Sequence, residues 1–139
     1  MHHDPADEKT LRNLANGYAL CVHPDGQFNY SIRANLSTGE SYPEGTELHT
    51  SRAFFMNTFG GQHVLVELAE LLNHKELSNA LVRHADYWIR QKRVSLSVIL
   101  FLAHAYRATG KKQYLRAVKQ ALKDVRLDLV TVGTDYEVP

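Results

Sequence analysis

The apolar residues in the second half of the chain recur every three or four positions, and this spacing constrains the fold more than any other feature. Side chains at this spacing lie on one face of an α-helix, whereas a strand would alternate apolar and polar residues. The pattern is interrupted at Asn73, after Gln91 and at Thr109–Gly110, where polar residues or glycine favour the end of a helix. The sequence therefore predicts a mainly α fold, in which residues 62–130 form antiparallel helical hairpins.

Two of these helices can be predicted in more detail. Residues 98–103 are apolar on nearly all sides of the predicted helix, which indicates an inner helix that its neighbours cover on most sides. Ser95 is the predicted cap of this helix. A second helical run lies upstream, and Gly60–Gly61 interrupts it. Because each glycine inside a helix costs about 1 kcal/mol relative to alanine, we expect a break there and a regular helix over residues 62–72.

The N-terminal segment carries the start signals of a separate helix. Asp4 is a favourable N-cap, Pro5 suits the first helical position, and the carboxylates of Asp7 and Glu8 oppose the helix dipole. We expect this helix to run to about Cys21, the only cysteine, which is predicted to be a buried, inert thiol. The face predicted to point inward carries Leu11, Leu14, Ala15, Tyr18 and Val22.

Turn and loop signals dominate the next part of the chain. Pro24 and Gly26 favour a turn that ends the first helix. Phe28, Tyr30 and Ile32 then alternate with polar residues, as in a short half-buried strand. Near residues 27–50 we therefore expect a short β-hairpin or a long loop.

The length of 139 residues, with 44% hydrophobic and 22% charged residues, is typical of one globular domain. The predicted organisation is a single helical domain over residues 1–139. Its parts are a first helix (1–22), a loop-rich segment (23–61), the helical hairpins (62–130) and a tail (131–139).

Several functional classes are disfavoured. No apolar run approaches the roughly 18 to 20 residues that cross a bilayer, so no membrane span is expected. The first ten residues are polar and acidic, unlike a secretory signal, which predicts a cytoplasmic location for the chain as written. If the chain is excised from a larger protein, its location is unknown. The eight histidines form no HExxH or similar metal motif and no GxGxxG is present, so no cofactor or metal is predicted, and His84 and His104 are expected at core or boundary positions.

An internal repeat accompanies the helical pattern. Leu68-Ala69 aligns with Leu102-Ala103 at an offset of 34 residues. With three residues added to the turn, the apolar positions Leu77, Ala80 and Leu81 align with Tyr114, Ala117 and Val118 at an offset of 37. This period is typical of helix-turn-helix repeats.

Residues 105–118, AYRATG followed by KKQYLRAV, resemble the hairpin of (α/α)-toroid proteins. These include six-hairpin glycosidases and polysaccharide lyases of the heparinase or alginate type. The segment Asp25–Phe28 with Tyr30, ahead of Arg52 and residues 57–61, is similar to the way such toroids place substrate loops between helices. A full toroid has about twice as many helices as this chain can supply, so the resemblance implies a partial toroid, an excised domain or a solenoid-like fragment.

The candidate site residues follow two kinds of polysaccharide chemistry. Hydrolysis needs two facing carboxylates, and Asp25 and three glutamates lie in the loops, although Asp25 before Gly26 also suits an ordinary turn. Elimination needs a base together with groups that neutralise a uronate. The residues proposed as catalytic are Tyr30, Asn57 and His63, and those proposed to bind substrate are Asp25, His49 and Arg52. The alternative to a catalytic role is that these side chains cap the backbone or lie at the surface.

Charge is distributed unevenly along the chain. Residues 1–73 hold four basic and nine acidic residues, a net of −5, whereas residues 74–128 hold twelve and four, a net of +8. The asymmetry indicates either an anionic partner or two halves that attract each other. A basic stripe on the predicted last helix comprises Lys112, Arg116, Lys119, Lys123 and Arg126. It could grip an anionic polymer or form a solvated face, and the lack of interleaved aromatic residues disfavours nucleic acid.

Two functions from different classes follow. The first is a helical domain that binds or processes an acidic polysaccharide through residues 25–63. The second is a non-enzymatic helical-repeat module that binds a protein partner.

Overall fold

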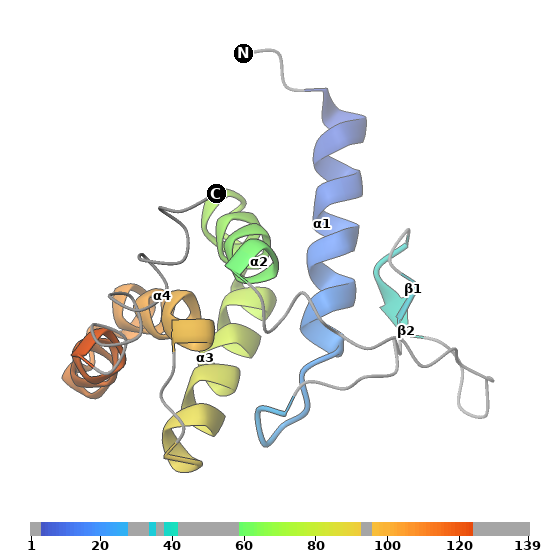
Figure 1. Ribbon diagram of the computed structural model, residues 1–139. Coiled ribbons are helices and arrows are strands. Elements are labelled where there is room, and N and C mark those ends of the chain that lie inside the picture. The colour runs from blue at the N-terminus through green and yellow to red at the C-terminus, as the bar shows by residue number, and fades with distance from the viewer. Residues whose placement is uncertain (1–3, 28–33, 36–37, 42–58, 93–95, 124–139) are drawn as a thin grey trace, which may run out of the picture.

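The computed structural model describes residues 4–27, 34–35, 38–41, 59–92 and 96–123. Most of these residues are helical (Figure 1), which confirms the predicted mainly α class. The helices are α1 (Pro5–Leu20), α2 (Phe59–Leu71), α3 (Lys75–Arg90), the short 3₁₀ helix η2 (Leu96–Val98), α4 (Ile99–Thr109) and a last helix over residues 112–123, red in Figure 1.

Helix α1 begins as its sequence predicts. The Asp4 carboxylate accepts a hydrogen bond of 2.9 Å from the backbone N–H of Ala6, and Pro5 occupies the first helical position. Ala15 and Val22 are buried, whereas Leu11, predicted to face inward, is 37% exposed. Cys21 is buried, as predicted.

The expected break at Gly60–Gly61 is wrong, because α2 begins at Phe59 and includes both glycines. These glycines lie in the first turn of α2. The backbone N–H groups of a first turn have no partner within the helix, so the entropy cost of glycine weakens few helical hydrogen bonds there. The regular helix expected over residues 62–72 is otherwise present.

Helix α3 is the central element, because it contacts α1, α2 and α4. Its buried side carries Leu77, Ala80, Leu81, His84 and Ala85. The burial of His84 and His104 agrees with the positions expected for them. Helix α4 contributes Phe101 and Leu102, both with no exposed surface, and Ile99 is half-buried, so α4 is covered as an inner helix should be. Ser95, its predicted cap, lies outside the described residues, and the α-helical part begins only at Ile99, after η2.

The loop-rich segment contributes two described pieces. The turn after α1 packs against α3, where the Gly26 carbonyl accepts a 2.8 Å hydrogen bond from His84 Nδ1. Beside α1, the two-residue strands β1 (Ala34–Asn35) and β2 (Glu40–Ser41) pair antiparallel. The strand predicted from Phe28 to Ile32 and most of the expected hairpin or loop lie outside the described residues.

The last two helices are joined at Gly110, which has a left-handed φ of 70° and donates its N–H to the Tyr106 carbonyl at 2.8 Å. The structure buries both members of the aligned pairs Leu68 and Leu102, and Leu77 and Tyr114. On the last helix Ala121 is buried, whereas the neighbouring Leu122 is 47% exposed. Among the described helices, none combines the length and the apolar character that a bilayer crossing needs.

Candidate functional site

The turn between α2 and α3 shapes one side of a polar pocket. Asn73 adopts a left-handed φ of 49°, a conformation that asparagine tolerates better than most residues. His74 then caps α3, since its Nδ1 accepts a 3.1 Å hydrogen bond from the backbone N–H of Leu77. The opposite ring nitrogen, Nε2, therefore carries the proton and donates to Asn16 Oδ1 on α1 at 2.6 Å. This buried, neutral histidine fixes where α3 begins.

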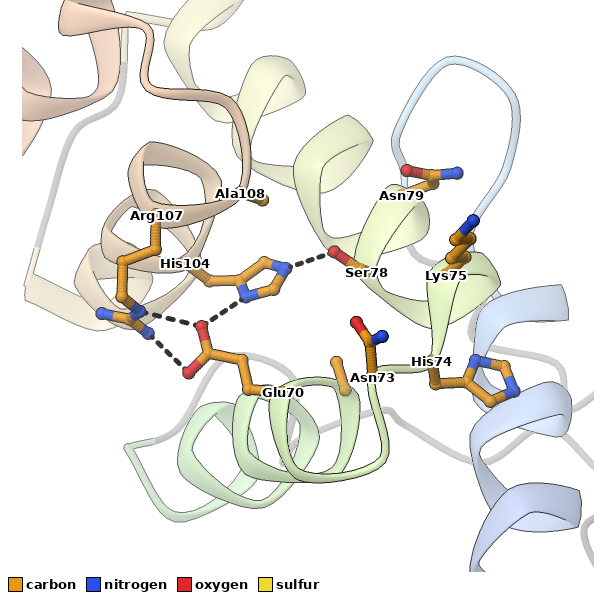
Figure 2. Close-up of a pocket in the computed structure, with 10 residues that line it drawn as sticks. Glu70, Asn73, His74, Lys75, Ser78, Asn79, His104, Arg107 and Ala108 are labelled. Atoms are coloured by element: carbon orange, nitrogen blue, oxygen red, sulfur yellow. Dashed lines mark hydrogen bonds and ion pairs between the residues drawn. The ribbon is translucent and has the colours of Figure 1, made fainter.

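The pocket lies between the end of α2, the start of α3 and the end of α4 (Figure 2), and it has a volume of about 280 Å³. We call it the Ser78 pocket. It is lined by Ala69, Glu70, Asn73, His74, Lys75, Ser78, Asn79, His104, Arg107 and Ala108. Most of these side chains are polar, and several can donate hydrogen bonds to a ligand.

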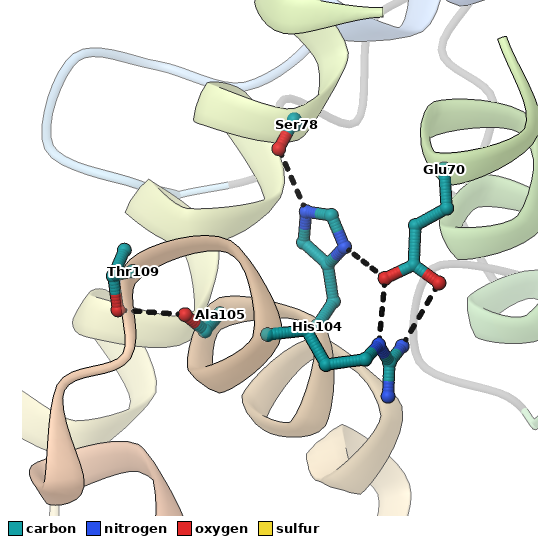
Figure 3. Close-up of polar contacts among 6 residues, drawn as sticks. Glu70, Ser78, His104, Ala105 and Thr109 are labelled. Atoms are coloured by element: carbon teal, nitrogen blue, oxygen red, sulfur yellow. Dashed lines mark hydrogen bonds and ion pairs between the residues drawn. The ribbon is translucent and has the colours of Figure 1, made fainter. Parts of the chain in front are cut away.

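A chain of polar contacts joins three helices at this pocket (Figure 3). Glu70 Oε2 on α2 lies 2.8 Å from His104 Nδ1 on α4, and His104 Nε2 lies 3.0 Å from the Ser78 hydroxyl on α3. Arg107 holds both oxygens of the same carboxylate, at 2.8 Å from Nε and 3.1 Å from Nη2.

The charge state of Glu70 follows from these contacts. Its partial burial would raise the pKa of the carboxyl, but the hydrogen bonds from Arg107 and His104 outweigh this effect and lower the pKa below its usual value. Glu70 is therefore ionised near neutral pH and can only accept hydrogen bonds. His104 Nδ1 must then be the donor, which leaves Nε2 as the acceptor for the hydroxyl proton of Ser78 when the ring is neutral.

A second pocket, the Arg83 pocket, has a volume of about 430 Å³. It is lined by Asn16, Ala19, Leu20, Gly39, Glu76, Asn79 and Arg83. Asn79 also lines the Ser78 pocket, so the two pockets adjoin along α3. Arg83 makes one long hydrogen bond of 3.5 Å to the Val22 carbonyl, and its buried Nε has no partner among the described residues.

Of the residues proposed from sequence, the structure describes two. Asp25 is exposed in the turn after α1, where its carboxylate accepts hydrogen bonds from the backbone and side chain of Gln27. His63 is exposed on α2, with Nε2 3.4 Å from Glu67. Neither lines the Ser78 pocket or the Arg83 pocket. The other proposed site residues, Tyr30, His49, Arg52 and Asn57, lie outside the described residues.

The basic stripe is a solvent-facing surface in the part that is described, because Lys112, Arg116, Lys119 and Lys123 are all exposed. No group of three or more histidine, cysteine, aspartate or glutamate side chains is placed to hold a metal ion within the described ranges. The polar side chains gathered by the fold are instead those at the two pockets.

Sequence reasoning missed the polar contacts of Glu70, Ser78 and His104. One signal was available, because the predicted repeat offset of 34 residues relates position 70 to position 104. It places both residues at equivalent points of α2 and α4, which contact each other. Ser78 has no such signal, since its side chain reaches the site only through the register of α3.

No protein-family model matches this chain, and neither the curated proteins nor the solved structures contain a match.

Proposed function

We propose that this chain is a helical domain that binds an acidic carbohydrate along α3, across the Ser78 pocket and the Arg83 pocket. The observation that carries the proposal is the position of Asn79, whose exposed side chain lines both pockets. One extended ligand that occupies both pockets would contact this residue at its centre. A side-chain amide both donates and accepts hydrogen bonds, which suits a ligand rich in hydroxyl groups.

The charges along α3 favour an anionic ligand. Lys75 and Arg83 line the two pockets, and neither forms an ion pair with any residue that the structure describes. With Arg107 they supply three positive charges against the two negative charges of Glu70 and Glu76, a net of +1 with neutral histidines. Because Glu70 is already paired with Arg107, a carboxylate on the ligand would find its cations in Lys75 and Arg83.

The size of the pockets supports a small repeating unit. Pockets that hold small ligands usually measure roughly 300–1,000 Å³. The volumes of about 280 and 430 Å³ lie just below and just above the lower limit of this range, which suits one or two sugar residues each. The likeness of residues 105–118 to an (α/α)-toroid hairpin points to the same class of ligand. A contribution from Tyr30, His49, Arg52 and Asn57 stays a prediction.

Titration calorimetry with oligogalacturonate, against a neutral oligosaccharide of the same length, tests the proposal. We expect Asn79→Ala and Arg83→Gln each to weaken uronate binding about 10- to 100-fold, the loss of one hydrogen bond that involves a charged group. Arg83→Gln should also reduce the preference for the acidic over the neutral ligand. Lys9→Gln, an exposed change on α1, is the matched control and should bind as the unmodified chain does.

Two results would contradict the proposal. If Lys112→Gln weakens binding as much as Arg83→Gln does, the ligand is held by the basic stripe on the last helix. If neither oligosaccharide binds, the helical-repeat interaction module becomes the better description. Such a module would offer apolar side chains such as Val64 and Leu71, which are 53% and 76% exposed on α2.

A further inference from the structure

The contacts around Ser78 have the order needed to activate a hydroxyl group. A serine in a helix commonly bonds to the backbone carbonyl four residues earlier. Ser78 instead bonds to His104, 26 residues away in sequence. Behind the imidazole ring lies an ionised carboxylate, Glu70, which sets the tautomer and would stabilise the positive charge that the ring acquires on taking a proton.

The site combines a protected base with an accessible hydroxyl. His104 is 3% exposed, so water competes little for its ring nitrogens. Ser78 is half-buried and lines the Ser78 pocket, so a ligand in that pocket can reach its oxygen. Asn73 lines the same pocket, and in Figure 2 its amide lies on the Ser78 side of the turn after α2. The side-chain amide of Asn73 carries N–H groups that can donate to a negatively charged oxygen of a ligand bound in this pocket.

We propose that Ser78 is a nucleophile, with His104 as its general base, and that the domain removes ester-linked acyl groups from the acidic carbohydrate that it binds. This inference rests on the proposed function for the identity of the sugar. Ser78 and His104 are the catalytic residues, and Glu70 is a positioning residue, because it acts through the imidazole ring.

The reaction balances with water as the only co-reactant. The Ser78 oxygen forms a bond to the ester carbonyl carbon, and its proton passes to His104 Nε2. As the bond from that carbon to the sugar oxygen breaks, His104 returns the proton to the sugar, which leaves as an alcohol. Water then attacks the acyl-serine in the same way, which releases a carboxylic acid and restores the Ser78 hydroxyl.

Arg107 affects the proton transfer from Ser78 to His104, although it neither gives nor takes the proton itself. Its guanidinium holds both Glu70 oxygens, which orients the carboxylate but also places a positive charge near the imidazole ring. The charged and titratable groups that line the pocket around His104 are Glu70 on α2, His74 at the cap of α3, Lys75 on α3 and Arg107 itself on α4. Replacing Arg107 by glutamine therefore favours the protonated ring, whereas replacing Glu70 by glutamine disfavours it.

Two assays test the nucleophile. A fluorophosphonate probe, which forms a bond to an activated serine oxygen with loss of fluoride, should label Ser78 in a peptide map. Acetate release from O-acetylated oligogalacturonate should fall at least about 100-fold in Ser78→Ala and in His104→Gln, the usual effect of losing such a group. His23→Gln, a change of an exposed histidine far along the chain from Ser78, should leave both results unchanged.

The pH profile separates a role in proton transfer from a structural role. The midpoint of the rise in rate with pH should move to higher pH in Arg107→Gln and to lower pH in Glu70→Gln. A purely structural role would change stability in urea without moving the midpoint. Labelling elsewhere than Ser78, or acetate release that persists in Ser78→Ala, would overturn the inference.

The failure of this inference can be told from the failure of the proposed function. If Ser78→Ala and the unmodified chain bind oligogalacturonate equally well and neither releases acetate, only the esterase inference is overturned. If Ser78-dependent release occurs from a simple acetyl ester while no uronate oligosaccharide binds, the nucleophile stands and the assigned sugar is wrong. Ser78→Cys, which keeps a nucleophile of similar size, should react poorly with the fluorophosphonate but should be alkylated at position 78 by iodoacetamide, and this labelling guards against loss of fold because Cys21 is buried.

Discussion

Replacing Gly26 by alanine should destabilise the protein far more than the same change at Gly110. Both glycines have a left-handed φ, of 92° and 70° respectively, so an added Cβ is strained at either position. Their surroundings differ. A Cβ at Gly26 would lie 2.1 Å from the carbonyl oxygen of Arg83, whereas one at Gly110 would have no neighbour within 4 Å.

The expected magnitudes follow from these surroundings. The left-handed conformation alone costs an alanine about 1–2 kcal/mol, which is the whole expectation for Gly110→Ala. At Gly26 the clash involves backbone of α3, which cannot yield easily, so the turn must move away from the helix. His84 Nδ1 then loses its acceptor, and an unsatisfied buried donor adds about 1–3 kcal/mol. We therefore expect Gly26→Ala to cost about 2–5 kcal/mol in the free energy of unfolding.

Urea unfolding, followed by the fluorescence of Trp88, measures both variants. Trp88 is the only tryptophan, and its indole N–H donates to His84 Nε2 at 3.0 Å, so its emission reports on this contact directly. The midpoint should fall in both variants, and in Gly26→Ala the native emission should also change. Equal losses of stability in the two variants would refute the reasoning, because only the contact of the turn with α3 separates them.

Three further predictions concern other buried polar groups. Burial lowers the pKa of His84 below its ordinary value of 6.5, although the hydrogen bond to Gly26 acts in the opposite direction. As the pH falls, this histidine therefore takes up a proton in the unfolded chain before it does so in the folded protein. Stability should therefore decline below about pH 6.5 by up to about 1.4 kcal/mol per pH unit, and His84→Asn, in urea titrations at several pH values, should flatten this slope. Burial and the hydrogen bond to Asp86 raise the pKa of Tyr114 from 10.0 to about 12, so stability should also fall from pH 10 to about pH 12. In an ultraviolet titration, Tyr114→Phe should lack the phenol that ionises near the upper end of this pH range. Gln62 has no exposed surface, and its Nε2 has no partner among the described residues. Gln62→Leu should therefore lower the thermal unfolding midpoint less than Gln62→Glu, which buries a charge. The reverse order of the two midpoints would contradict this prediction.

The helices could be predicted because their information is local. The Asp4 cap, Pro5 and the left-handed stop at Gly110 each act within a few residues, and each lies where its sequence signal placed it. The start of α3 is different, because histidine is an unusual N-cap. His74 can serve because Asn16, 58 residues earlier, accepts from its other ring nitrogen and holds the ring in place. A cap that depends on a distant partner is not visible in a local pattern.

The candidate site could not be predicted for the same reason. Sequence patterns group residues that lie near one another in the chain, and they directed attention to residues 25–63. Ser78 and His104 lie on separate helices, and their meeting depends on the rotation of α3 and α4 about their own axes. A rotation of one residue, about 100°, would turn either side chain away from the pocket. Periodicity tells which face of a helix is apolar, and it leaves the polar contacts at the edge of that face undetermined.

The uneven charge of the chain bears on its partners. If its main role were to hold the two halves together, ion pairs between the acidic residues 1–73 and the basic residues of 74–128 would be numerous. In the part of the chain that the structure describes, the only ion pair between a carboxylate of residues 1–73 and a lysine or arginine of residues 74–128 joins Glu70 to Arg107. Lys75, Lys112 and Arg116 remain exposed without an ion pair in that part. The positive charge is therefore directed mainly at solvent, where a screened attraction to an anionic ligand accelerates binding and weakens as salt is added.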